Sequence, residues 1–345
     1  MAGLNKNTRK IPVRFGYLIN TALFAALLLG GTKVIGSGAV SMYHTKVILL
    51  CGINIILALS LNLATGFLGQ LPLGHAGFMA LGAYSSAIFM RNVTILPPEA
   101  LFPFGILIGG LMAAFIGFLI GIPALRLKGD YLAIITLGFG EIIRVVLLNI
   151  DDVLGFKLTY GAASLKNIPK TTNFFNTFLC VAITCFVIYT YIKSRHGRAT
   201  LAVRDNEIAA EACGISTTYY KTLGFTVSAF FAGVAGALYA GYLGVLSPSS
   251  FGFMKSIEIL VTVVLGGMGS MAGSVISATV LTALPEVLRA FSEYRMIAYS
   301  LLLVIVMIFK PTGLMGNYDF SLSTLIGRFN GNASKKFEKE GGKHE

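Results

Sequence analysis

The chain consists mainly of long apolar runs separated by short polar segments. A helix needs about 20 apolar residues to cross roughly 30 Å of hydrocarbon, and seven runs approach or exceed that length: 15–36, 46–66, 68–90, 104–123, 131–150, 177–193 and 221–245. Another run, 257–288, is interrupted by glycines and fits either two short spans or a re-entrant hairpin, and a last span is predicted at 296–310. We therefore predict an all-α fold, a polytopic transmembrane helical bundle with about 8–10 spans, some of them broken or re-entrant.

The composition supports a membrane protein. Hydrophobic residues make up 55% of the chain and charged residues only 12%, and the mean hydropathy is +0.77. The 40 glycines suit helices whose backbones approach closely in lipid. The net charge of +12 is spread over loops and is not clustered with aromatic side chains, so we expect membrane lipid and no nucleic acid around this chain.

The Lys and Arg residues predict the orientation. With the N-terminus inside the cell, the inner segments hold 17 of the 27 Lys and Arg residues, in agreement with the positive-inside rule. We thus expect a cytoplasmic segment at 1–14, a transmembrane domain at 15–310 and a cytoplasmic tail at 311–345. The predicted location is the cytoplasmic (inner) cell membrane, with both termini inside.

Residues 193–222 form a strongly charged island between two predicted spans. Its stretch Leu201–Cys213 favours one short helix that ends at Gly214. A solvent-facing helix between two spans suggests a contact site through which another protein moves the spans. The candidate contact residues are Arg204, Asp205, Glu207, Glu211 and Gly214.

The segment 60–78 places polar residues, glycines and a proline inside a predicted span. Pro72 lacks a backbone donor, and irregular backbone at membrane depth is tolerated only beside protein or a watery cavity. A broken helix that lines a translocation path is the functional interpretation; a kinked helix in which His75 and Gln70 satisfy neighbours is the alternative. The run around 265–273 is a second predicted break. The candidate path residues are Asn62, Gly66, Gly69, Gln70, Pro72, Gly74, His75, Gly266, Gly267 and Gly269.

Glu141 and Arg144 lie three residues apart in a predicted span, so they can share a helix face and form an intramembrane ion pair. We expect the pair near the outer end of the span, where Arg144 can extend toward water. It marks either a pathway or partner contact, or a structural pair.

Several chemical motifs are missing. The chain has no phosphate-binding loop, no His-Glu-x-x-His and no Gly-x-Ser-x-Gly, and its four cysteines have no metal-ligand spacing. We therefore expect no catalytic residue, metal or cofactor on this chain. If ATP drives its activity, another chain binds the nucleotide.

Four ordered stretches, 62–78, 129–144, 197–215 and 265–273, resemble the branched-chain amino acid ABC transporter permeases, specifically the LivM-like subunit. The resemblance covers about residues 45 to 315, and Pro72 departs from the Ser usual in this family. It implies a type II ABC importer permease fold. It also implies a LivH-like second permease, two ATP-binding subunits (LivG-like and LivF-like) and an extracytoplasmic substrate-binding protein that delivers Leu, Ile or Val.

The resemblance implies inward transport by alternating access, coupled to the separate ATPase subunits through the island helix. Related permeases for urea, short amides or other amino acids share much of this pattern. An ion-coupled secondary transporter is a further alternative. Its few candidate carriers are Glu141, Glu286, Glu293 and His75.

Overall fold

The computed structural model describes residues 30–33, 41–93, 97–127 and 129–288, with scattered positions between 294 and 314. The predicted segment 1–14, most of the first predicted span and nearly all of the tail lie outside the described residues. The chain divides into two units: Met1–Ala39 with Tyr318–Glu345, and Val40–Asn317. In the first unit the described residues form one helical turn, Gly30–Lys33. All the other described helices belong to the second unit.

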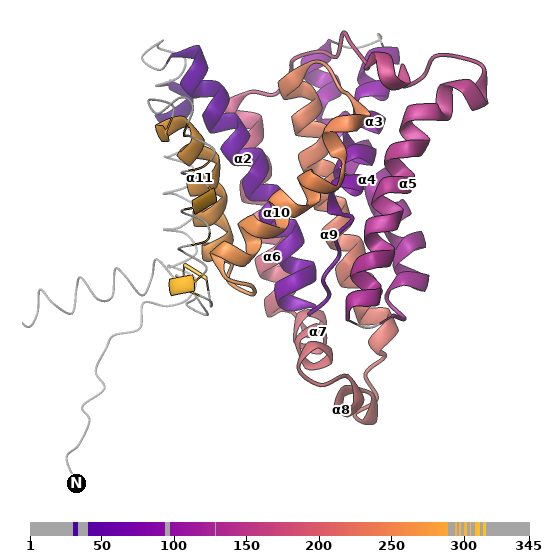
Figure 1. The fold of residues 1–345 in the computed structure, drawn as a ribbon, viewed down its shortest axis with the longest axis vertical. Coiled ribbons are helices and arrows are strands. Elements are labelled where there is room, and N and C mark those ends of the chain that lie inside the picture. The colour runs from indigo at the N-terminus through magenta and orange to yellow at the C-terminus, as the bar shows by residue number, and fades with distance from the viewer. Residues whose placement is uncertain are drawn as a thin grey trace, which may run out of the picture. The chain divides into compact units, whose positions relative to one another are not determined.

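The described part of this second unit is all-helical apart from one isolated bridge between Leu165 and Leu246 (Figure 1). In chain order its helices are α2 (Met42–Asn62) with a π-helical turn (Leu63–Phe67), α3 (His75–Asn92), α4 (Pro98–Ala124), α5 (Asp130–Leu154), α6 (Phe174–Lys193), α7 (Arg195–Asp205), α8 (Glu207–Ala212), α9 (Thr217–Leu243), α10 (Phe253–Gly266) and α11 (Met271–Val287), with 3₁₀ turns at Gly161–Ala163 and Pro248–Phe251.

Five helical stretches among the described residues are long and apolar enough to cross a membrane. They are Met42–Phe67, Ala100–Ala124, Asp130–Val153, Phe174–Lys193 and Thr217–Leu243. The predicted all-helical membrane fold is therefore confirmed. Helix α3 and the pair α10 and α11 overlap the predicted runs 68–90 and 257–288 but are not among these five.

The glycine-interrupted run 257–288 forms two helices, α10 and α11, joined at Gly267–Ser270. With 14 residues, α10 rises about 21 Å, which is less than the hydrocarbon thickness of about 30 Å. Helix α11 packs along α2, as Figure 1 shows. The run is thus a helical hairpin, which we call the α10–α11 hairpin.

The single helix predicted over Leu201–Cys213 is wrong. Asn206 interrupts it with an extended backbone (φ −157°, ψ 107°), and its side chain accepts a hydrogen bond from Ala209 N at 3.0 Å. An asparagine that caps a new helix competes with continuation of the old one. The island therefore holds two short helices, α7 and α8, which Figure 1 shows together at one end of the unit.

Helices α3, α4 and α9 pack against one another through their glycines. A Cβ placed on Gly82 of α3 would lie 2.2 Å from Gly233 O of α9, and one on Gly233 would lie 2.6 Å from Gly109 O of α4. A Cβ on Gly109 would in turn lie 2.7 Å from Gly82 O. No side chain larger than hydrogen fits at these positions, so the three backbones touch directly.

Gly236 of α9 offers a test of this packing, because a Cβ there would lie 2.0 Å from Met79 O of α3. We expect Gly236→Ala to lower the free energy of unfolding by about 1–3 kcal/mol, as overpacking does. The measurement is the melting temperature of the detergent-solubilised chain. Gly138→Ala is the control, since nothing lies within 4 Å of its added Cβ. Equal melting temperatures for the two variants would contradict the packing argument.

Candidate functional site

The helix that begins as α2 breaks after Phe67, and residues 68–74 are non-helical. Two backbone amides at this break reach side chains of other helices. Leu73 N donates to Thr136 Oγ1 of α5 at 3.1 Å, and Ala76 N donates to Ser256 Oγ of α10 at 3.1 Å. Pro72, which is buried, has no amide to satisfy. The irregular backbone therefore lies against protein, which is the condition for keeping it at membrane depth.

Asn62 joins the break to the turn of the α10–α11 hairpin. Its Nδ2 donates to Ser270 O at 2.9 Å and to Ser274 Oγ at 2.8 Å. Its Oδ1 accepts from Gly269 N at 2.8 Å. Asn62 is 1% exposed, so its amide serves these partners and does not face an open path in this conformation.

The glycines of the two breaks meet at the same place. A Cβ on Gly66 would lie 2.1 Å from Gly269 N, so the π-helical turn and the hairpin turn are in backbone contact. Gly267 (φ +102°) and Gly269 (φ +85°) adopt backbone conformations that favour glycine, and a Cβ on Gly266 would lie 2.6 Å from Gly273 C. We call this meeting place, formed by Asn62, Gly66 and 266–270, the hairpin junction.

His75 links α2 to α3. It is 1% exposed, and its Nε2 lies 2.8 Å from Ser60 Oγ. Ser60 Oγ also lies within hydrogen-bonding distance of Leu57 O, at 2.8 Å. The neighbouring Gly74 packs on α5, where its Cβ would lie 2.0 Å from Thr136 O.

The remaining candidates at the break are more accessible. Gly69 is exposed and Gln70 is half-buried. Gln70 N donates to Ala64 O at 2.9 Å, which closes the end of the π-helical turn. Among the residues proposed for a translocation path, Gly69, Gln70 and Gly269 are not buried in this conformation.

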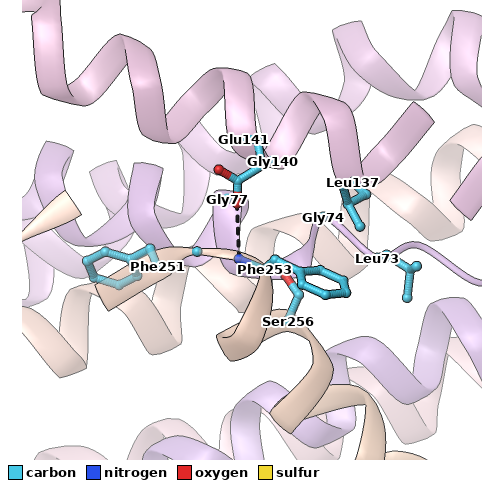
Figure 2. Close-up of a pocket in the computed structure, with 10 residues that line it drawn as sticks. Leu73, Gly74, Gly77, Leu137, Gly140, Glu141, Phe251, Phe253 and Ser256 are labelled. Carbon is cyan, nitrogen blue, oxygen red and sulfur yellow. Dashed lines mark hydrogen bonds between the residues drawn. The ribbon is translucent and has the colours of Figure 1, made fainter. Parts of the chain in front are cut away.

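Glu141 and Arg144 form the predicted ion pair, with Arg144 Nε 2.6 Å from Glu141 Oε2. Glu141 lies near the middle of α5, and the position of the pair near the outer end of the span stays a prediction. Figure 2 shows its carboxylate aimed at Phe253, whose N–H donates to Glu141 Oε1 at 3.0 Å. The carboxylate thus binds the first turn of α10, where negative charge is favourable.

The pair borders a small pocket between α3, α5 and the start of α10 (Figure 2). The pocket has an empty volume of about 170 Å³, which includes space open to solvent. Glycines of α3 and α5 form part of its wall. A Cβ on Gly77 would lie 3.0 Å from Gly140 Cα of α5, and one on Gly140 would lie 3.0 Å from Gly74 Cα, just before α3. In this conformation the pocket is a gap between closely packed helices and not a substrate chamber.

Two of the candidate contact residues of the island make internal contacts. Glu207 pairs with Lys221 of α9 at 2.7 Å, and that lysine is 4% exposed. Glu211 Oε1 accepts from Thr217 Oγ1 at 2.7 Å. Gly214 (φ +79°) ends the island's second helix as predicted. Both acids therefore fasten α8 to the start of α9.

Arg204 reaches from α7 to the break. Its Nη1 donates to Gly66 O at 2.9 Å, while Nε and Nη2 donate to Asp205 Oδ1 at 3.0 and 2.8 Å. Residues proposed separately for a translocation path and for partner contact are therefore in direct contact.

The partners that complete these contacts were missed in the sequence: Thr136, Lys221, Ser256, Ser270 and Ser274. A hydroxyl beside glycine in an apolar run is a signal for Ser270 and Ser274, because buried hydroxyls need partners. Among the described residues no three His, Cys, Asp or Glu side chains are placed to hold a metal ion.

Residues 43–310 match the protein family described as "Branched-chain amino acid transport system / permease component". The chain belongs to this family. The permease is similar to LivM of Escherichia coli K12, a high-affinity branched-chain amino acid transport system permease protein, with 38% identity over 88% of this chain and 77% of the relative. For LivM of Salmonella typhimurium LT2 the identity is 39%, over 76% of this chain and 68% of the relative.

A shorter match relates the permease to LivH of Salmonella typhimurium, a permease protein of the same transport system. The two are 35% identical over 41% of this chain and 45% of the relative. No solved structure matches the chain significantly.

Asn62→Leu tests the hairpin junction, because it keeps a side chain of similar size and removes three hydrogen bonds. Each bond contributes about 0.5–1.5 kcal/mol, so we expect a loss of a few kcal/mol and faster proteolysis within 266–270. Asn149→Leu is the control, since its Nδ2 donates only to Val145 O of its own helix. Thermal melting and limited proteolysis of the purified permease measure both effects. An Asn62→Leu protein as stable as the control would rule out this role.

Proposed function

We propose that the permease is one of two membrane subunits of an ATP-driven importer for Leu, Ile and Val, located in the cytoplasmic membrane. Separate chains hydrolyse the ATP, and an extracytoplasmic binding protein delivers the substrate. The similarity to LivM over most of the chain carries this proposal, and the LivH match supports a second permease of the same family as its partner. This chain acts as the transport component and has no catalytic role of its own.

In alternating access, the helices switch between an outward-open and an inward-open arrangement, whose relative stability changes during the transport cycle. ATP binding can bias them only through contacts that form in one arrangement and not in the other. The substrate passes between the two permeases, and Gln70 with the backbone of 68–74 can replace part of its hydration. Asn62 and His75 contribute to the path only in an arrangement where they give up their present hydrogen bonds and bind the substrate instead.

The end of the permease that holds α7 and α8 faces the ATPase subunits in this proposal. Ile208 of α8 is 78% exposed, so its side chain is accessible to another protein. Its neighbours Glu207 and Glu211 point into the permease and hold α8 in place. Ile208 is therefore a better candidate for the ATPase contact than the two acids.

Uptake measurements test the substrate and the energy source. In cells that lack their own branched-chain uptake, co-expression with the second permease, both ATPases and the binding protein should restore uptake of radiolabelled Leu, Ile and Val. Uptake should vanish when the phosphate-loop Lys of the ATPases is replaced. Competition by urea, short amides or other amino acids instead would assign another substrate. Uptake without any ATPase subunit would indicate a secondary transporter.

Ile208→Asp tests the ATPase contact. Burying an Ile side chain is worth about 1.5–3 kcal/mol, so losing this contact should weaken ATPase binding by about 10- to 150-fold. The measurement is the amount of ATPase that co-purifies with the tagged permease. Ile208→Val keeps an apolar side chain and should retain most of the binding. Equal co-purification with both variants would place the contact elsewhere.

A further inference from the structure

The break in α2 leaves one backbone carbonyl without its helical partner. In a continuing α-helix Gly66 O would accept from Gln70 N, but that amide donates to Ala64 O at 2.9 Å. The following residues offer few alternative donors to Gly66 O, because residues 68–74 are non-helical and Pro72 has no N–H. An unsatisfied buried carbonyl costs roughly 1–3 kcal/mol, so this group requires a donor from elsewhere.

Arg204 supplies that donor. Its Nη1 lies 2.9 Å from Gly66 O, and hydrogen bonds from a charged donor are about twice as strong as neutral ones. Asp205 holds the other side of the guanidinium through Nε and Nη2. The planar fork of arginine permits both contacts at once, which a lysine ammonium cannot reproduce with the same geometry.

The surrounding backbone is shaped to admit the Arg204 side chain. A Cβ on Gly69 would lie 2.6 Å from Arg204 Cγ. The absence of a side chain at Gly69 therefore leaves room for the Arg204 side chain. On the far side, Gly66 touches Gly269 of the hairpin turn, and a Cβ on Gly269 would lie 3.9 Å from Arg204 Nη1. One guanidinium therefore lies where α7, the break and the α10–α11 hairpin converge.

We propose that Arg204 is the positioning residue that links movement of α7 to the break in α2 and to the hairpin turn, through its bond to the Gly66 carbonyl. This role rests on the proposed function, because α7 moves only if a partner moves it. The bond forms only while the end of α7 stays within hydrogen-bonding distance of the break. It thus gives the two arrangements of the helices a differential contact of the kind that coupling requires.

Arg198→Gln provides a matched control for Arg204→Gln. Both arginines lie on α7, are exposed and donate Nη1 to a backbone carbonyl. The acceptor of Arg198 is Lys193 O at the adjoining end of α6, at 3.0 Å, whereas the acceptor of Arg204 belongs to the broken helix. Both substitutions remove a guanidinium and its bond to a backbone carbonyl, and Arg204→Gln also removes the pairing with Asp205.

The first measurement uses the full complex, with both permeases, both ATPases and the binding protein, in proteoliposomes. We expect Arg204→Gln to lower the amount of substrate imported per ATP hydrolysed at least tenfold and Arg204→Lys to give an intermediate loss. Arg198→Gln should match the wild type. Loss of ATPase co-purification with an unchanged import ratio would show that Arg204 only binds the ATPase, and would overturn the proposal.

The second measurement needs no substrate. Leu71→Cys places a thiol on an exposed position of the break, in a Cys213→Ser background that removes the exposed native thiol. Maleimide labelling of the complex should change on adding a non-hydrolysable ATP analogue, and Arg204→Gln should abolish that change while Arg198→Gln retains it. A nucleotide-dependent change that survives in Arg204→Gln, or is absent in the wild type, would overturn the proposal. A different transported substrate would revise the proposed function and leave this result standing.

Discussion

Direct backbone contact at glycines is the constraint on which the rest of this permease depends. Between helices in lipid there is no hydrophobic driving force, so close van der Waals contact and interhelical hydrogen bonds must hold them together. Gly82, Gly109 and Gly233 bring α3, α4 and α9 to such contact, and Gly66 with Gly269 brings two irregular segments together. A Cβ at any of these five positions would approach another residue of the fold, and at the first four it would lie within 2.7 Å of it.

Close approach in turn places short polar side chains within reach of neighbouring backbones. Ser228 of α9 donates to Ser60 O at 2.6 Å, and Thr172 donates to Leu238 O at 2.8 Å. Asn62 satisfies two backbone groups of the hairpin turn in the same way. The irregular stretch from Gly66 to Ala76 is kept because helices α5, α7 and α10 supply partners that lipid would not. The break is therefore a feature of the assembled fold as much as of its own residues.

The residues of the charged island have two roles, to stabilise the local fold and to contact other parts of the assembly, and the composition does not show which residue has which role. Lys221 is nearly inaccessible and needs Glu207 as its partner, since an unpaired buried charge is costly. These contacts hold α8 against the N-terminal start of α9 and leave Ile208 exposed. On the neighbouring helix, Arg204 turns inward to the break. Within one short segment, Glu207 and Lys221 stabilise the fold, Ile208 faces outward, and Arg204 contacts the broken helix.

The sequence by itself determined the all-helical membrane class, the two glycine-rich breaks, the island between spans and the family resemblance. These follow from local signals, namely apolar run length, proline and glycine positions, and charge. The tertiary structure decided what the breaks contact. Arg204 meets Gly66 across 138 positions and Asn62 meets Ser270 across 208, and Glu141 binds both Arg144 and the start of α10. Asn206 also divided a helix that residue propensities predicted as continuous. The sequence indicates which polar groups need hydrogen-bond partners. Only the packing of distant segments places a donor beside a particular acceptor.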